Sequence, residues 1–253
     1  MASKRRGAGI GTVCVVLAVV GAVAVWGVVT VVGALSGFRP AEGWEPEAAA
    51  PSAPDPLSAA PALAPVGSDG AIEPTWLTEV AGATGIPERA LAAYAAADAR
   101  ARQDGCAVGW NTLAGIGWVE SHHGALHGGE VQADGFARPE ILGIPLDGTN
   151  RTLAIPDTDG GALDGDTEWD RAVGPLQFIP ETWRRWGVDA NGDGAASPHS
   201  IDDAAAAAAD YLCRLDGTLE GSDAWIRAIR SYNDTLDYQT QVARAAVRYA
   251  ASG

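Results

Sequence analysis

Glu120 is the residue of this sequence best suited to acid–base chemistry. Within residues 110–124 (WNTLAGIGWVESHHG), Leu113, Ile116, Gly117 and Glu120 recur at helical spacing and share one face of a predicted helix. A carboxyl group at the end of such a core-facing stripe loses part of its hydration, which raises its pKa and keeps a proton available near neutral pH. The stripe therefore predicts a general acid/base. The alternative is a surface carboxylate paired with an arginine.

Two further stretches carry side chains suited to binding a sugar. In the turn-rich residues 171–180 (RAVGPLQFIP), the amide of Gln177 lies beside the aromatic ring of Phe178, a combination that suits hydroxyl and N-acetyl groups. Tyr232 and Asn233 stand between two predicted helices, where a hydroxyl and an amide can face a cleft. The alternative for this second pair is an ordinary helix end.

A third stretch, residues 189–194 (DANGDG), has the D-x-N-x-D-G spacing of a cation-binding loop. The acidic residue usual at position 12 is replaced by Ser200, and Asp203 can supply the last carboxylate if the loop is three residues longer. The alternative is that Asp203 only caps the helix that follows Ser200. The all-oxygen donor set favours calcium over magnesium, with these predicted ligands: Asp189, Asn191, Asp193, the carbonyl of Ala195, and Asp203.

Helical periodicity predicts a mainly α-helical domain that positions these groups. The predicted helices cover residues 75–83, 87–103, 110–122, 180–186, 201–214, 223–231 and 235–250. Pro87 is expected at the first helical position of its helix, and Ser200 and Ser222 are expected as N-caps. Residues 124–173 are rich in Gly, Asp and Pro and lack helical periodicity, which predicts a long ordered loop with short strands.

The N-terminal third predicts attachment to a membrane. Residues 1–8 carry three basic residues and are expected in the cytoplasm, and residues 9–38 form an apolar run long enough to cross a bilayer as an uncleaved signal anchor. The alternative is secretion after cleavage at the small residues 34–36. Residues 39–74, rich in Pro and Ala, predict an extended, disordered linker to a domain at 75–253.

Cysteine usage and charge narrow the classes of function. Cys106 and Cys213 are the two cysteines of the exported part and predict one disulfide. From Trp76 onward the sequence has 13 arginines, no lysine and 26 acidic residues. Such a domain repels phosphate backbones, which argues against nucleic acid and fits a neutral polymer or a site for cations.

Taken together and in this order, these motifs resemble the B family of membrane-bound lytic murein transglycosylases, in the form found in exported actinobacterial proteins. The resemblance covers about residues 76–250. It implies a lysozyme-like helical fold that cleaves peptidoglycan, with Glu120 as the catalytic acid/base and Asp203 as the late ligand of a calcium loop. The residues that it implies for substrate binding are Ser121, Gln177, Phe178, Tyr211, Tyr232 and Asn233. Residues 124–173 have no counterpart in the resemblance.

The resemblance implies cleavage of the β-1,4 bond between N-acetylmuramic acid and N-acetylglucosamine, with formation of a 1,6-anhydro ring. The expected protein is a monomer at the cell membrane, with its catalytic domain outside the cytoplasm and no organic cofactor. Two alternatives stay open at this point. One is a hydrolysing muramidase that takes a second carboxylate from residues 157–170. The other is a calcium-stabilised wall-binding module without turnover.

Overall fold

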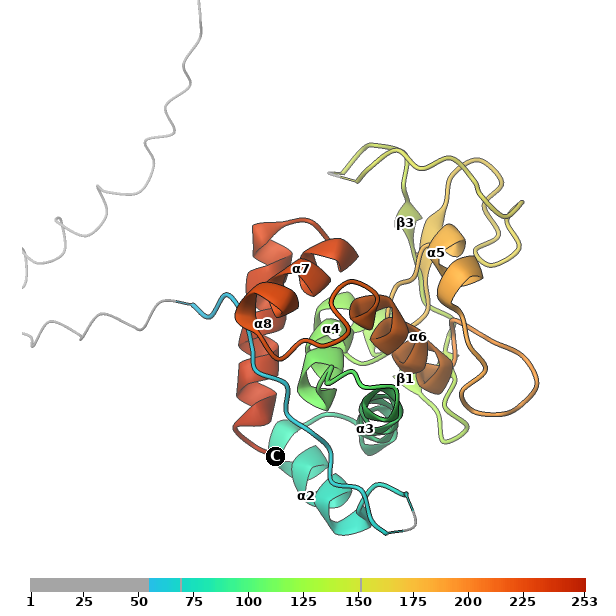
Figure 1. The fold of residues 1–253 in the computed structure, drawn as a ribbon. Coiled ribbons are helices and arrows are strands. Elements are labelled where there is room, and N and C mark those ends of the chain that lie inside the picture. The colour runs from blue at the N-terminus through green and yellow to red at the C-terminus, as the bar shows by residue number, and fades with distance from the viewer. Residues whose placement is uncertain (1–54, 69, 151) are drawn as a thin grey trace, which may run out of the picture. The chain divides into compact units, whose positions relative to one another are not determined.

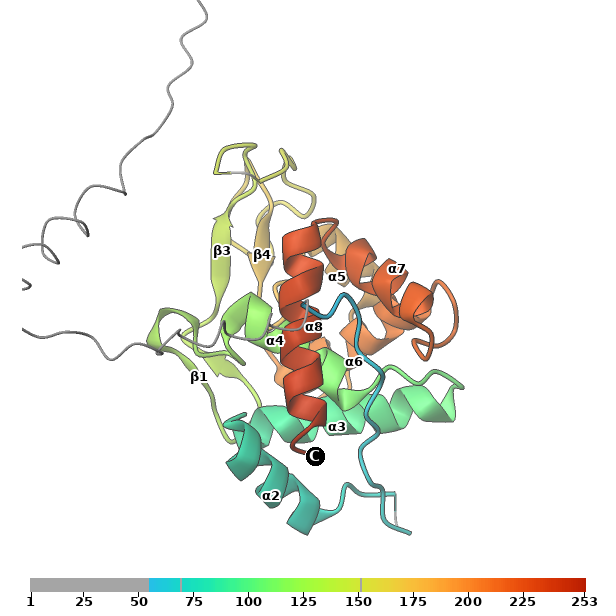
Figure 2. The same ribbon diagram turned by 90° about the vertical axis from the view of Figure 1, so that its left-hand side faces the viewer.

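Helix α4 (Trp110–Ser121) lies at the centre of the fold in a computed structural model that describes residues 55–68, 70–150 and 152–253. Every residue of α4 from Trp110 to Gly117 is buried. Helix α8 (Leu236–Ala250) packs along one side of α4, and α3 (Glu88–Gln103) packs against another (Figures 1 and 2). Burial therefore surrounds most of α4 instead of following one stripe, and the turn that carries Glu120 is where the helix reaches the surface.

The other helices match the sequence prediction to within two residues. They are α2 (Pro74–Thr84), α5 (Pro180–Trp186), α6 (Ile201–Cys213) and α7 (Ser222–Tyr232). Ser200 caps α6 as predicted, since its side chain accepts a hydrogen bond from the amide of Asp203. Two predicted caps are wrong by one position: Pro87 is the N-cap of α3, and Gly221, not Ser222, precedes α7.

A run of small residues brings α6 close to α3. Residues 204–209 are six consecutive alanines, and all are buried. Because methyl side chains keep the helices close, the guanidinium of Arg100 on α3 reaches the carbonyl oxygen of Ala206 at 2.9 Å. The same guanidinium also pairs with Asp210. Helix α6, which follows the predicted cation loop, is thereby fixed to the core.

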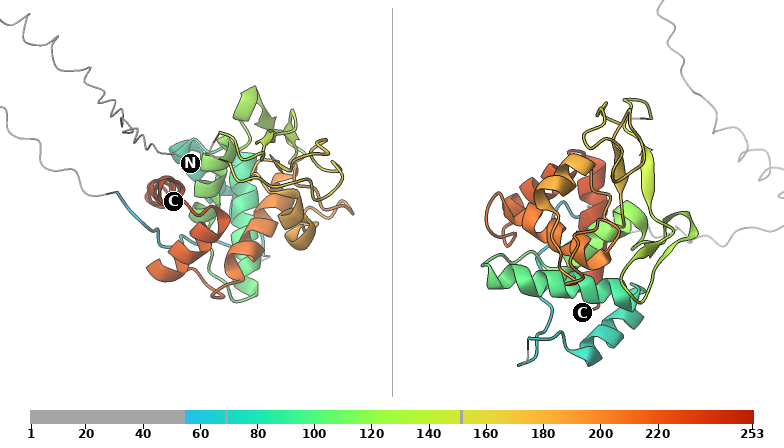
Figure 3. Two further views of the ribbon diagram at one scale, coloured as in Figure 1. Left: turned by 90° about the horizontal axis from the view of Figure 1, so that it is seen from above. Right: turned by 90° about the vertical axis from the view of Figure 1, so that its right-hand side faces the viewer.

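The segment between α4 and α5 is a long excursion with short strands, as predicted. It contains a 3₁₀ turn (Leu126–Gly128), the antiparallel pair β1 (Glu130–Val131) and β2 (Ala137–Arg138), and a second antiparallel pair, β3 (Leu142–Pro145) and β4 (Arg171–Val173). Leu142 pairs with Val173, which returns the chain to the core directly before residues 174–180. Figure 3 shows the part of the excursion around β3 and β4 beside α5, at the opposite end of the domain from α2, whereas Figure 2 shows β1 lower, nearer to α3 and α2.

The predicted linker, residues 39–74, differs from the structure in its second half, because residues 55–73 pack on the domain as a strap. Ala64 is buried, and its amide donates to Oδ2 of Asp98 at 3.1 Å. Asn111, at the start of α4, accepts from the strap at Oδ1 and donates to the strap at Nδ2. The folded part therefore includes residues that lie up to about 20 positions before the predicted domain boundary. The strap also runs beside α8 (Figure 1).

The predicted disulfide is confirmed. Cys106, which follows α3, is bonded to Cys213, the last residue of α6, and their Cα atoms are 6.1 Å apart. The predicted cytoplasmic segment (1–8), the signal anchor (9–38) and the first part of the linker lie outside the described residues. Across the part of the chain that is described, no helix combines the length and apolar character needed to span a bilayer.

Candidate active site

The carboxyl group of Glu120 lies in the last turn of α4, where it is partly buried against α8. Oε1 of Glu120 accepts a hydrogen bond from the hydroxyl of Tyr238, at 2.6 Å. Burial raises the pKa of Glu120 to about 7, and the hydrogen bond from Tyr238 opposes part of that rise because it stabilises the charged form. No arginine pairs with Glu120 among the described residues, so the alternative of a surface ion pair is wrong. Its proton is available near neutral pH.

Tyr238 is the residue of this site that sequence reasoning missed. It stands in the first turn of α8, where Thr235 caps the helix and accepts from the amide of Tyr238. Helical periodicity places Tyr238 on the same face as Val242 and Tyr249, which marks it as a core residue. The packing of α8 beside α4 then brings the hydroxyl of Tyr238 to Glu120. No pattern in the sequence predicts this contact between the two residues.

A hollow of about 160 Å³ is lined by Tyr232, whose ring stacks on that of Tyr238. Its lining comes from α5, α6, α7 and the loop before α5: Gln177, Phe178, Ile179, Thr182, Tyr211, Ser231 and Tyr232. Glu120 is not part of the lining, but two stacked aromatic rings, those of Tyr238 and Tyr232, connect it to the hollow. The ring of Tyr232 stacks on that of Tyr238, with centroids 6.4 Å apart and an angle of 4° between the planes. Burial, helped by the charge of Glu120, raises the pKa of both tyrosines.

Three of the residues that line this hollow are aromatic: Phe178, Tyr211 and Tyr232. The ring of Tyr232 meets Phe178 edge to face at 5.8 Å and Tyr211 at 5.6 Å. Both hydroxyls are already engaged, since Tyr232 donates to the carbonyl of Leu176 at 2.8 Å and Tyr211 donates to the carbonyl of Ser231 at 2.6 Å. These tyrosines therefore present ring surface to a ligand in the hollow, which suits stacking against the apolar face of a sugar.

Gln177 stands in a constrained backbone conformation at the edge of the hollow. Its φ of 51° lies in the left-handed region, which is uncommon for a residue other than glycine. The turn is closed by pairing between Val173 and Phe178, and Nε2 of Gln177 donates to the carbonyl of Gly174 at 2.9 Å. Glycine is required at position 174, because a Cβ there would lie 1.8 Å from the carbonyl oxygen of Pro198. The turn holds the side-chain oxygen of Gln177 ready to accept a hydrogen bond from a ligand.

The two remaining predicted binding residues do not line this hollow. Ser121 is 2% exposed; its hydroxyl donates to the carbonyl of Pro175 at 2.6 Å and accepts from the amide of Gly124. That position contradicts a direct contact with substrate and makes Ser121 a positioning residue that ties the end of α4 to the Gln177 turn. Asn233 is exposed, and its side-chain oxygen accepts from the hydroxyl of Thr235 at 3.1 Å.

The acidic residues of the excursion hold their own loop together. Asp157 and Asp159 accept from backbone amides of residues 159–163, and Asp164 and Asp166 accept from amides of residues 166–171. Asp170 is fully buried, and its carboxylate accepts from the amide and the hydroxyl of Thr158. Among the described residues, no second carboxylate contributes to the raised pKa of Glu120. The site thus offers one carboxyl group for acid–base chemistry.

The comparison with protein families agrees with a site of this kind. Residues 159–248 match the family model of the transglycosylase SLT domain. The match covers just over a third of the chain and includes the Gln177 turn, the Asp189 loop, Tyr211 and Tyr238. It supports the general assignment to the lytic transglycosylases with a lysozyme-like helical fold, which act on peptidoglycan. The finer B-family assignment is not reached by this match.

The SLT match begins after α4, so the assignment of Glu120 depends on the geometry of the site and not on the family model. Searches of curated proteins and of solved structures found no match to the chain. The strongest link between Glu120 and the SLT segment is the hydrogen bond from Tyr238, because Tyr238 lies within the matched residues.

The predicted cation loop lies inside the SLT segment and is closed by hydrogen bonds. Asp189 accepts from the amides of Gly192 (2.7 Å) and Gly194 (2.9 Å), and Asp193 accepts from the amide of Ala195 (2.9 Å). The oxygen of Asn191 accepts from the amide of Asp193 at 2.9 Å. Each predicted side-chain ligand of the loop therefore turns an oxygen inward, toward the loop backbone.

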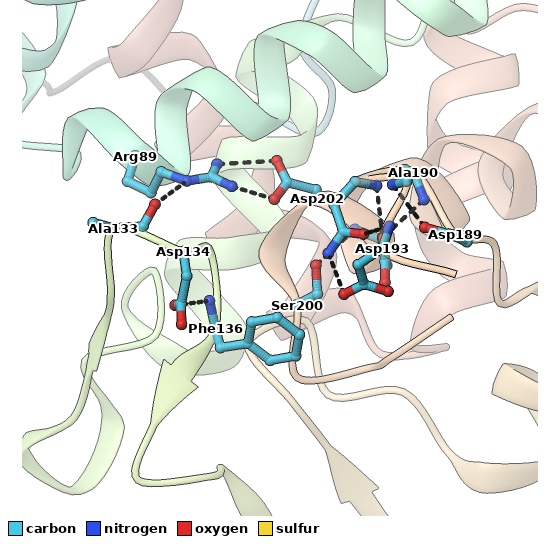
Figure 4. A network of polar contacts seen from close by, with 12 residues as sticks. Arg89, Ala133, Asp134, Phe136, Asp189, Ala190, Asp193, Ser200 and Asp202 are labelled. Carbon is cyan, nitrogen blue, oxygen red and sulfur yellow. Dashed lines mark hydrogen bonds and ion pairs between the residues drawn. The ribbon is translucent and has the colours of Figure 1, made fainter. Parts of the chain in front are cut away.

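Asp203 joins this loop to α6, which answers the question of whether it is only a helix cap. It is fully buried, and its carboxylate accepts from the amides of Ala190 (2.8 Å), Asn191 (3.1 Å) and Ser197 (3.0 Å). Ser200 supplies the cap alone, so the carboxylate of Asp203 serves the loop. Burial raises the pKa of Asp203, the three amides lower it, and the charge of Asp189 raises it again. Asp202, the preceding residue, pairs with Arg89 across to α3 (Figure 4).

Among the described residues, one group of three acidic side chains brings oxygens within 4.8 Å of one another: Asp157, Asp159 and Asp170 in the excursion. The loop of Asp189 does not converge to this degree. The oxygens of the excursion group are the same ones that accept the backbone and Thr158 hydrogen bonds described above. Their arrangement is therefore explained by the fold of the excursion.

Proposed function

We propose that the protein is a lytic transglycosylase of the B-family kind, which cleaves peptidoglycan strands at N-acetylmuramic acid and releases a 1,6-anhydro product. The observation that carries the proposal is a single carboxyl group, Glu120, with a pKa of about 7, connected through the stacked rings of Tyr238 and Tyr232 to a hollow suited to a sugar. Ordinary glycosidases use two carboxyl groups, and one is sufficient when the substrate supplies its own nucleophile.

The proposed reaction begins with protonated Glu120. Glu120 gives its proton to the oxygen that links N-acetylmuramic acid to N-acetylglucosamine, and the bond from that oxygen to the anomeric carbon breaks. The N-acetyl carbonyl oxygen of the muramyl residue stabilises the anomeric centre. Glu120, now ionised, takes the proton of the muramyl C6 hydroxyl as that oxygen bonds to the anomeric carbon. The ring closes, Glu120 is protonated again, and no water is consumed.

The other residues position the strand in this proposal. The rings of Tyr211 and Tyr232 support the sugar faces, and the oxygen of Gln177 accepts a hydrogen bond from a hydroxyl or N-acetyl N–H group. Tyr238 keeps Glu120 in one orientation. Since the hydroxyl of Tyr232 is engaged by Leu176, its contribution to orienting the N-acetyl group is through its ring.

The mass of the products tests the proposed function directly. Purified peptidoglycan digested by the protein is expected to yield muropeptides that are one water lighter than those made by a hydrolase. A hydrolysing muramidase would give reducing ends of full mass, and a wall-binding module would release nothing. Either of these results would overturn the proposal.

The pH dependence of cleavage is expected to have one limb. Because protonated Glu120 starts the reaction, kcat/KM should be constant at acid pH and fall as the pH rises through about 7. A second, ionised carboxylate would add a limb at acid pH. Tyr238→Phe removes the hydrogen bond that favours the charged form, so the midpoint should move up by about one unit. Tyr249→Phe, which changes a tyrosine bonded to His123, should leave the midpoint unchanged.

We further propose that the Asp189 loop binds calcium. Support comes from the all-oxygen donors, and from the buried carboxylate of Asp203 beside the charge of Asp189, whose repulsion a cation would relieve. The residues that would hold the ion are Asp189, Asn191, Asp193, Asp203 and the carbonyl of Ala195. The ion would supply stability to the loop and to the start of α6, and no catalytic step depends on it.

Calcium is therefore expected to raise the melting temperature. At about 100 times the Kd, binding contributes about 2.7 kcal/mol, which corresponds to about 5–10 °C for a domain of this size. Asp203→Asn should abolish the calcium-dependent shift, and magnesium should not reproduce it. The matched control is Asp157→Asn, in the acidic group of the excursion. Loss of the shift in that variant, with the shift kept in Asp203→Asn, would place the ion in the excursion and contradict the proposal.

The setting of the enzyme is also a proposal. We propose that residues 9–38 anchor the protein in the cell membrane as a single span, that the domain lies outside the cytoplasm, and that it acts as a monomer. Support comes from the apolar run with basic residues before it, and from a disulfide that is typical of exported proteins. Secretion after cleavage near residue 36 is the other outcome, and the mass of the mature protein distinguishes the two.

A further inference from the structure

A second hollow, of about 380 Å³, adjoins the one described above. Its lining residues come from α5, from α6 and from the residue that follows α6: Glu181, Thr182, Arg185, Trp186, Tyr211 and Arg214. Thr182 and Tyr211 line both hollows. A strand that occupies the Gln177 hollow can therefore extend a substituent into the second one without leaving the surface.

Arg214 is held in a fixed orientation at this second hollow. Its guanidinium lies 3.6 Å from the centroid of the ring of Tyr211, and Nη1 donates to the carbonyl of Tyr211 and to the hydroxyl oxygen of Ser231 (3.2 Å). Nε and Nη2 make no hydrogen bond among the described residues. Stacking and two hydrogen bonds thus orient one side of the guanidinium, and the donors of the other side are left for a ligand.

Among the residues that the structure describes, no acid forms an ion pair with Arg214. Nine arginines of the described residues form ion pairs with carboxylates, and Arg214 is not among them, although acidic residues outnumber arginines two to one in this domain. Within the hollow, Glu181 is paired with Arg185. One positive charge therefore remains. It lies beside the ring pair of Trp186 and Tyr211, whose centroids are 5.9 Å apart at an angle of 88°.

We propose that this hollow, the Arg214 subsite, binds a carboxylate carried by the glycan strand and gives the enzyme a preference for anionic over neutral strands. The inference rests on the proposed function and deepens it. A planar guanidinium with two free donors matches a carboxylate, and the neighbouring rings accept the apolar group that carries it. The strand has two sources of that chemistry: the lactyl carboxyl of a muramyl residue without peptide, and the carboxyl groups of an attached stem peptide.

Binding to a protein that cannot turn over its ligand tests this subsite. Glu120→Gln serves as the background, and three ligands are compared: a neutral N-acetylglucosamine oligomer, a strand fragment with free lactyl carboxyls, and the same fragment with stem peptides. Adding Arg214→Gln should weaken the binding of the anionic fragments about five- to tenfold and change the affinity for the neutral oligomer less than twofold. High salt should remove most of the difference. The fragment that loses affinity identifies the source of the carboxylate.

Two control variants separate a specific subsite from a general effect. Arg227→Gln makes the same charge change at an exposed arginine paired with Asp216, outside both hollows, and should affect no ligand. Arg214→Lys keeps the charge but loses the planar fork, and should recover only part of the affinity.

Equal weakening of all three ligands by Arg214→Gln would mean that Tyr211 has been disturbed, and no weakening would mean that the subsite does not bind carboxylates. Both results overturn the inference while leaving the proposed function intact. If the Glu120→Gln protein binds none of the three ligands, the proposed function itself fails, and the inference fails with it.

Discussion

Glu120→Gln is expected to lower the rate of peptidoglycan cleavage by about 10²–10⁴-fold, the range that a positioned general acid/base contributes. Glutamine keeps the shape of the side chain and its capacity to accept from Tyr238, but it has no proton to give to the leaving oxygen. Binding of glycan fragments should therefore change little, and the loss should appear in kcat. Release of anhydro-muropeptides measured by mass spectrometry gives the rate.

The same substitution should make the domain more stable above neutral pH. Because burial raises the pKa of Glu120 from 4.5 to about 7, ionisation is less favourable in the folded than in the unfolded state. The folded state then binds more protons between these pH values, so stability falls as the pH rises from about 4.5 to 7. Glu120→Gln removes this penalty, which amounts to about 3 kcal/mol at most. The free energy of unfolding of Glu120→Gln should therefore exceed that of the unchanged protein by an amount that grows between pH 5 and pH 8.

A matched control distinguishes this from a general effect of removing an acid. Glu79→Gln makes the same change on the exposed side of α2 and should alter neither cleavage nor the pH dependence of stability. Persistent cleavage by Glu120→Gln would show that another group protonates the leaving oxygen. A loss of stability in Glu120→Gln above pH 7 would contradict burial as the cause of the raised pKa of Glu120.

The sequence predicted the helices because their signals are local. Apolar spacing, the Ser200 cap and the Gly- and Pro-rich breaks each act within a few residues, and the observed helices follow them closely. The strap, residues 55–73, was not predicted, because its composition is that of a linker. What orders it are side chains distant in sequence, such as Asp98 and Asn111, which satisfy its backbone amides and carbonyls.

Part of the site could be predicted because the residue types that carry its chemistry are also a local signal. Glu120, Gln177, Tyr211 and Tyr232 carry recognisable chemistry. The structure places Gln177, Tyr211 and Tyr232 in the lining of one hollow. The partner of Glu120 could not be predicted, since it depends on the packing of α8 against α4. Ser121 shows the opposite case. The family resemblance implied a contact of Ser121 with substrate, but the end of α4 turns its hydroxyl inward to the carbonyl of Pro175.

The second large effect is expected from removing the disulfide. Cys106→Ala with Cys213→Ala should lower the free energy of unfolding by about 4–5 kcal/mol, because the bond closes a loop of 107 residues and limits the unfolded chain. Urea denaturation of the variant, and of the unchanged protein with and without reductant, measures the loss. The reduced protein should match the variant. A difference below about 1 kcal/mol would mean that the bond stabilises little beyond the packing of α3 on α6.

The position of this bond leads to a test of how α6 is held. Cys213 fixes the end of α6 to the residue after α3, and Asp203 fixes its beginning to the Asp189 loop. These residues are ten positions apart, which is about 15 Å along a helix. Effects of separate sites at this distance usually add to within about 0.5 kcal/mol. Asp203→Asn combined with loss of the disulfide should therefore lower the free energy of unfolding by the sum of the two separate losses. A cost well below the sum would mean that one attachment already releases the whole helix, and with it Tyr211 and the wall of both hollows.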